Sequence, residues 1–94
     1  MHSRCQVLHR DIKPGNAVVG VGLATSTVHL IDFGISKRFI DPKTGVHIKL
    51  QHIGNLTGTC PYASNNALNK MELSRRDDLE SLVYMLIKLA TGTL

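Results

Sequence analysis

Four polar residues in the first third of the chain could act together on a phosphate ester: Asp11, Lys13, Asn16 and Asp32. A carboxylate can orient a hydroxyl group and accept its proton, which is the role we assign to Asp11. Asn16 and Asp32 offer the hard oxygen ligands that Mg²⁺ prefers, and such a metal would neutralise a nucleotide's phosphates. Lys13 lies two positions after Asp11, so it can bring a positive charge to the phosphate that moves.

The order and spacing of these residues carry more weight than any one of them. Residues 9–16 read HRDIKPGN and fit the pattern H-R-D-x-x-x-x-N, and Asp-Phe-Gly follows at 32–34. Alone, each residue would be an ordinary turn, cap or surface residue. Together they resemble the catalytic motifs of eukaryotic protein kinases. The resemblance implies ATP as cofactor. Asp11 would be the catalytic base, and Lys13 would lie near the phosphate of ATP that is transferred. Asn16 and Asp32 would hold Mg²⁺ beside the nucleotide.

Three motifs further along the chain narrow the resemblance. They are Asn55-Leu56-Thr57-Gly58-Thr59, Tyr62-Ala63-Ser64 and Ser74-Arg75-Arg76-Asp77-Asp78-Leu79-Glu80-Ser81-Leu82. They are similar to those of the casein kinase 1 family of serine/threonine protein kinases, which lacks the Ala-Pro-Glu motif of most kinases, as this chain does. Lys13 also fits a serine/threonine kinase better than a tyrosine kinase. The resemblance covers nearly the whole chain and implies protein substrates.

The same resemblance implies supporting roles for four residues. Thr57 would lie near Asp11 and help to orient the catalytic loop. Asp78 would anchor the backbone of that loop, and it could equally serve as a negative charge at a helix N-terminus. His9 would pack beneath the loop, and Arg10 would contact the activation segment.

One position departs from the family pattern. Pro61 stands where casein kinase 1 usually has an arginine, which helps to bind an anion such as a priming phosphate on the substrate. Proline has neither a charge nor a backbone N–H. The resemblance therefore does not extend to a preference for phosphate-primed substrates.

The 94 residues contain no glycine-rich loop, strand lysine or helix glutamate of the kind that holds ATP in kinases. We therefore expect residues 1–94 to be a partial protein kinase domain of the α+β class. It would be a C-lobe fragment with catalytic loop, β-hairpin, activation segment and central helix, but without the N-lobe and the C-terminal part of the C-lobe. We expect this chain alone neither to bind ATP measurably nor to fold stably. The alternative hypothesis is a catalytically inactive remnant that acts only as an interaction module.

Short elements are expected to position the site. Residues 1–8 read as the end of a helix that runs into a strand at 6–8. Strands at 17–21 and 27–31 would form a hairpin with small residues at 22–26 between them. Residues 35–60 form a long segment with a turn at 41–45, and a short helix is expected near 66–70.

The clearest helix starts after Ser74. Either Ser74 or Asp77 could supply its N-cap, and Gly92 its C-terminal stop. Its apolar residues recur at the helical period: Leu79, Leu82, Val83, Leu86, Ile87 and Ala90. Since they form one apolar face, we expect this helix to be buried in a core.

Composition excludes several other classes of protein. The net charge of +4 comes from scattered basic residues, and there are only two tyrosines and two phenylalanines. This pattern argues against nucleic acid as a partner, because no stacking platform accompanies the charge. The two cysteines lie far apart and the five histidines lack metal-ligand spacing. With no apolar run long enough for a bilayer, we expect no membrane partner and a cytoplasmic or nuclear location. The oligomeric state is not encoded in any recognisable pattern.

Overall fold

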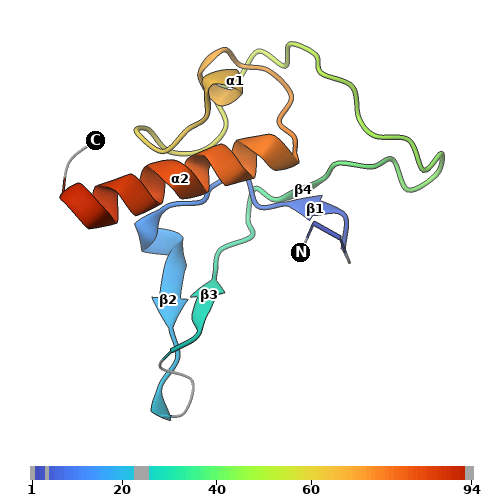
Figure 1. Cartoon of the computed structure of the whole chain (residues 1–94). Coiled ribbons are helices and arrows are strands. Elements are labelled where there is room, and N and C mark those ends of the chain that lie inside the picture. The colour runs from blue at the N-terminus through green and yellow to red at the C-terminus, as the bar shows by residue number, and fades with distance from the viewer. Residues whose placement is uncertain (1, 4, 23–25, 93–94) are drawn as a thin grey trace.

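The structure is a computed structural model that describes residues 2–3, 5–22 and 26–92. Its elements in chain order are β1 (Val7–Leu8), a 3₁₀ turn (Pro14–Asn16), β2 (Ala17–Val19), β3 (Val28–Leu30), β4 (Lys37–Arg38), α1 (Asn65–Leu68) and α2 (Arg75–Thr91). Two small sheets and two helices make this an α+β structure, as predicted. Its assignment to a kinase C-lobe stays a prediction. In Figure 1, α2 runs through the middle of the molecule, and the catalytic loop passes beside its N-terminal half.

Each sheet is a single antiparallel pair of strands. β2 pairs with β3, with Ala17 opposite Leu30. This pairing confirms the predicted hairpin, whose residues 23–25 lie outside the described residues. β1 pairs with β4, with Val7 opposite Arg38. The second pairing is not local, because it brings the chain just before the catalytic loop against the chain just after Asp-Phe-Gly. Figure 1 shows the β2–β3 hairpin projecting away from the helices.

The predicted main helix is confirmed at both ends. Ser74 is the N-cap of α2, and the Asp77 carboxylate accepts the backbone N–H of Ser74 at 2.8 Å. The Asp77 N–H in turn donates to the Ser74 carbonyl at 3.0 Å. The two bonds satisfy N–H groups at the start of the helix, where partners within the helix are missing. Gly92 ends the helix in the left-handed conformation, at φ 77°, and its N–H bonds to the Lys88 carbonyl.

The prediction that α2 is buried is wrong for this chain. Of its apolar residues, only Met85 is fully buried. Five others are exposed: Leu79, Val83, Leu86, Ile87 and Leu89. The periodicity correctly indicated an apolar face, but periodicity does not show whether the chain provides anything to cover it. Within the described residues, α1 contacts α2, yet these five side chains stay exposed.

The shorter elements differ from their predictions at the edges. α1 spans Asn65–Leu68, slightly ahead of the predicted 66–70, because the Ser64 hydroxyl caps it by accepting the N–H of Ala67. The helical end predicted for residues 1–8 is wrong where the structure describes it, since the described residues before β1 lie in turns. The turn at 41–45 is confirmed by a bond from Gly45 N–H to the Asp41 carbonyl.

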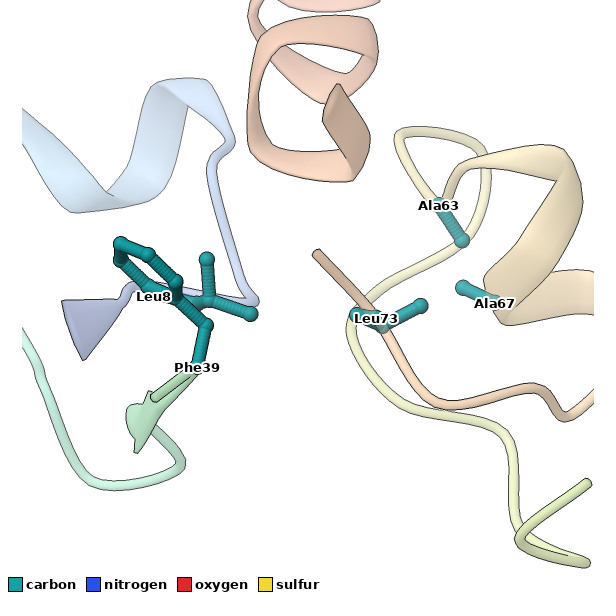
Figure 2. Packing of buried hydrophobic residues seen from close by; sticks show 5 residues of the cluster. All are labelled: Leu8, Phe39, Ala63, Ala67 and Leu73. Carbon is teal, nitrogen blue, oxygen red and sulfur yellow. The ribbon is translucent and has the colours of Figure 1, made fainter. Parts of the chain in front are cut away.

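The hydrophobic core is small and joins three parts of the chain. Figure 2 shows its five residues, Leu8, Phe39, Ala63, Ala67 and Leu73. Leu8 lies in β1 and Phe39 directly follows β4, and the other three come from α1 and the chain on either side of it. The core therefore ties the strand that leads into the catalytic loop to the segment that leads into α2.

Candidate active site

The catalytic loop, residues 9–16, is held to the first turn of α2 by one carboxylate. Asp78 accepts the backbone N–H of His9 at 2.8 Å and that of Arg10 at 2.9 Å. It also lies 2.9 Å from Nε2 of His2. Asp78 is only 4% exposed, so these bonds form where water does not compete. The role implied for Asp78 by the family resemblance is present in the structure.

His9 packs beneath the loop, also as expected. It is fully buried, and its ring meets the Phe33 ring edge-on at 4.8 Å. Nδ1 accepts the backbone N–H of Asp11 at 3.2 Å, which requires the proton to be on Nε2. Nε2 then donates to the Ile31 carbonyl at 2.9 Å. One imidazole ring thus fixes the distance between Asp11 and the chain that leads into Asp32.

Asp11 is the centre of a compact polar cluster. Its Oδ1 accepts the hydroxyl of Thr59 at 2.8 Å, and its Oδ2 lies 3.3 Å from the amide nitrogen of Asn16. The Lys13 ammonium donates to the same Thr59 oxygen at 3.1 Å and lies 3.8 Å from Asp11 Oδ2. The carboxylate is therefore oriented by two neutral donors and kept close to a cation, while remaining partly open to solvent. This arrangement suits a group that must meet a substrate hydroxyl.

The threonine that hydrogen-bonds to Asp11 is Thr59. The family resemblance had instead implied that Thr57 lies near Asp11. Both threonines lie in the same motif, and in a regular strand residues two apart point to the same side. Gly58 lies between them with φ 95°, which breaks that alternation. The glycine between the two threonines was a signal that the motif is not a strand, but it does not reveal which hydroxyl faces the loop.

Asn16 lies at the end of the 3₁₀ turn, buried beside Asp11. Pro14 begins this turn with a preset φ, and the Asn16 N–H closes it on the Lys13 carbonyl at 3.0 Å. Asn16 Nδ2 donates to the Asp11 carbonyl at 3.0 Å. Since the nitrogen end of the amide is used in this way, its oxygen end is the one available to a metal.

Asp32 lies beyond the hairpin in an exposed, left-handed position at φ 59°. The hairpin ladder continues from Ala17–Leu30 to a bond from Ile31 N–H to the Asn16 carbonyl at 2.9 Å, so Asp32 follows directly on the residue paired with Asn16. One carboxylate oxygen of Asp32 accepts the Gly34 N–H at 3.2 Å. Among the described residues, no hydrogen bond joins Asp32 to Asp11 or to Asn16.

Asn16 and Asp32 together fit Mg²⁺ by the chemistry of their donor atoms, an amide oxygen and a carboxylate. In the part of the chain that the structure describes, no cluster of three or more His, Cys, Asp or Glu side chains could hold a metal ion. A Mg²⁺ ion here would therefore rely on these two side chains and on further oxygen atoms from phosphate and water, which is how Mg²⁺ usually binds. Such an ion would supply charge neutralisation for the nucleotide.

The comparison with known families agrees with this geometry. The family model of the protein kinase domain matches residues 1–94, and the chain belongs to that family. Protein kinases use ATP and Mg²⁺ to transfer a phosphoryl group to protein substrates. The kinase prediction is thereby confirmed at the level of the family. The casein kinase 1 type and the preference for serine and threonine stay predictions. No helix in the described residues is long and apolar enough to cross a membrane.

Proposed function

We propose that this chain carries the catalytic residues of a protein serine/threonine kinase of casein kinase 1 type. The reaction is transfer of the γ-phosphate of ATP to a serine or threonine hydroxyl of a protein substrate. Under this proposal, residues 1–94 correspond to the part of a kinase C-lobe from the catalytic loop to the central helix. The proposal goes beyond membership of the protein kinase family in two respects: the casein kinase 1 type, and a serine or threonine hydroxyl as the phosphate acceptor.

One observation carries the proposal: the shared hydrogen bonds of Asp11, Lys13 and Thr59. Thr59 donates to Asp11 and accepts from Lys13, so the base and the cation are held on one hydroxyl. A hydroxyl substrate that approached Asp11 would meet a proton acceptor and find a positive charge beside the incoming phosphate. Proton acceptance and charge stabilisation are the two contributions that phosphoryl transfer to a hydroxyl requires.

The casein kinase 1 type is supported by the placement of its distinguishing motifs. Residues 55–59 supply Thr59 to the active site, and residues 74–82 supply Asp78 to the backbone of the catalytic loop. These two motifs thus each contribute a side chain that contacts the catalytic loop. Ser64, from the middle motif, bonds to the buried Asp77 at 2.8 Å and joins α1 to α2.

The proposal can be tested in a hybrid kinase, in which residues 1–94 replace the corresponding stretch of a complete casein kinase 1 domain. Peptides that offer a single serine, threonine or tyrosine are incubated with Mg-ATP, and phosphate incorporation is measured. We expect transfer to the serine and threonine peptides. Asp11→Asn should lower kcat about 10²- to 10⁴-fold, because the proton acceptor is lost while the shape of the side chain is kept.

Asp41→Asn is the matched control. Among the described residues, the Asp41 carboxylate makes a single local turn bond, to the Lys43 N–H, and its replacement should leave kcat unchanged. Full activity of Asp11→Asn would remove Asp11 from the role of base. Transfer to tyrosine alone would contradict the serine/threonine assignment.

One observation favours the alternative of a non-catalytic interaction module, namely the exposed apolar residues of α2. Exposed apolar patches often mark surfaces that bind another protein. A hybrid that binds Mg-ATP in calorimetry with normal stoichiometry, yet transfers no phosphate to any peptide, would favour this alternative over the kinase.

A further inference from the structure

Gly58 lies very close to the backbone of the catalytic loop. A methyl group built on its α-carbon would lie 2.9 Å from the carbonyl oxygen of Arg10. Real Cβ atoms do not come this close to a backbone oxygen, so a side chain at position 58 would force one of the two segments to move. Gly58 also has φ 95°, a conformation that disfavours residues with a side chain.

The catalytic loop has little freedom to move away. The Arg10 N–H is bound to the buried Asp78 at 2.9 Å, and the Arg10 side chain donates to the Ile35 carbonyl at 2.6 Å. Arg10 itself has φ 71°, which a non-glycine residue adopts only where its surroundings enforce it. A shift of the Arg10 carbonyl would therefore break contacts on both sides of the loop.

The space around the contact is also nearly full. The cavity between the catalytic loop, residues 57–59 and the start of α2 has a volume of about 10 Å³. This is at the lower limit for a single water molecule. The void therefore leaves little room for a methyl group at position 58. Because the catalytic loop is held on both sides by the bonds of Arg10, we expect the segment 57–59 to move instead.

The next residue along this segment is Thr59, whose hydroxyl lies 2.8 Å from Asp11. We infer that Gly58 is a positioning residue for phosphoryl transfer, an inference that rests on the proposed kinase function. The bare α-carbon of Gly58 packs against the Arg10 carbonyl and thereby sets Thr59 at bonding distance from both Asp11 and Lys13. Gly58 touches no reacting atom, and it acts through Thr59.

The chain provides a matched control for backbone strain. Gly54 lies in the same segment with φ 83°, but a methyl group there would meet nothing within 4 Å. Gly54→Ala and Gly58→Ala therefore impose similar strain on the backbone, and only the second adds the collision with Arg10. A difference in kcat between the two variants therefore measures the effect of the collision with the Arg10 carbonyl, apart from backbone strain.

The test uses the hybrid kinase with Gly58→Ala, Gly54→Ala, Thr59→Ala and the double variant Gly58→Ala/Thr59→Ala. We expect Gly58→Ala to lower kcat about 10²-fold, because a displacement of about 1 Å at a positioning group costs that much. Its affinity for Mg-ATP, measured by calorimetry, should be unchanged. Gly54→Ala should keep its kcat, and the double variant should be no slower than Thr59→Ala alone, since both changes remove the same contact.

The outcomes separate this inference from the proposed function. A hybrid with Gly58 intact that binds Mg-ATP but transfers no phosphate contradicts the kinase assignment. An active hybrid whose Gly58→Ala variant keeps normal kcat contradicts only the inference. Multiplicative losses in the double variant, or a Gly58→Ala variant that unfolds and no longer binds Mg-ATP, also overturn it, because Gly58 would then be a purely structural residue.

Discussion

The two ends of α2 have opposite surroundings. At the helix start, Ser74–Asp78, two carboxylates are almost completely buried. Further along lies the exposed helix face, which we define as Leu79, Val83, Leu86, Ile87 and Leu89. Globular proteins usually show the reverse, with charges outside and aliphatic residues inside.

The two buried carboxylates are tolerated because each of them accepts several hydrogen bonds. Asp77 bonds to Ser64 and Ser74, and Asp78 bonds to two backbone N–H groups and to His2. A buried charge without such partners would be strongly unfavourable. The comparison therefore indicates that the chain's own contacts are concentrated where they position the catalytic loop. The exposed helix face has apolar area that these 94 residues leave unused.

The largest effect is expected at the helix start. Asp78→Ala removes the acceptor of two backbone N–H groups, and we expect the free energy of unfolding of the hybrid kinase to fall by about 1–3 kcal/mol for each group left unsatisfied. Hydrogen–deuterium exchange of the hybrid kinase should show that the amides of His9 and Arg10 lose protection first. Asp41→Ala, which removes a single local turn bond, is the control. Equal protection of His9 and Arg10 in the Asp78 variant would mean that the loop holds itself in place.

A smaller effect is expected on the exposed helix face. Leu86 is 53% exposed and its neighbour Met85 is 6% exposed, so the two form a matched pair. Leu86→Gln should change the free energy of unfolding by no more than about 0.5 kcal/mol, whereas Met85→Gln should cost about 2–5 kcal/mol.

Self-association provides a second readout for the same pair. If the exposed helix face drives contacts between copies of the chain, sedimentation should show less association for Leu86→Gln than for the unchanged chain. A large loss of stability for Leu86→Gln would show that the exposed helix face is covered in solution.

Proximity within the candidate site could be predicted from the sequence better than packing could. Asp11, Lys13 and Asn16 lie close together because they belong to one tight loop, whose shape depends on Pro14 and on short-range bonds. The ends of α2 were also predictable, since Ser74 and Gly92 act locally. Contacts between distant segments were harder to predict. Sequence spacing did not indicate that Thr59 would reach Asp11.

Burial was the least predictable property, because it depends on what else the chain contains. The apolar spacing along α2 is the same whether its face is covered or open. The pairing of Lys37 with the buried Glu72, at 2.6 Å, illustrates the same limit. Nothing in the sequence around Lys37 indicates this partner, which lies far along the chain. Only the fold brings β4 and the segment before α2 together.

The smallest effect is expected at the junction between the two regions, where α2 meets α1. Tyr84 donates to Glu80 at 2.7 Å, and the same Glu80 oxygen accepts the Asn65 N–H at 2.8 Å. The hydrogen bond to Glu80, burial and the negative charge of Glu80 all raise the pKa of the Tyr84 hydroxyl above its usual value. Because the folded-state pKa is raised, this bond stabilises the fold fully below the unfolded-state pKa of about 10. That stabilisation is lost as the pH rises through the folded-state pKa.

Ultraviolet titration of the chain in a Tyr62→Phe background, which leaves Tyr84 as the only tyrosine, should therefore show ionisation above the normal pH range for tyrosine. Adding Glu80→Gln should return the Tyr84 pKa towards its usual value, because the negative charge of Glu80 is removed while a hydrogen-bond acceptor remains. The amide exchange of Asn65 should respond at the same pH, since Asn65 shares the Glu80 oxygen. A normal Tyr84 pKa with Glu80 intact would mean that this link between the two helices does not form in solution.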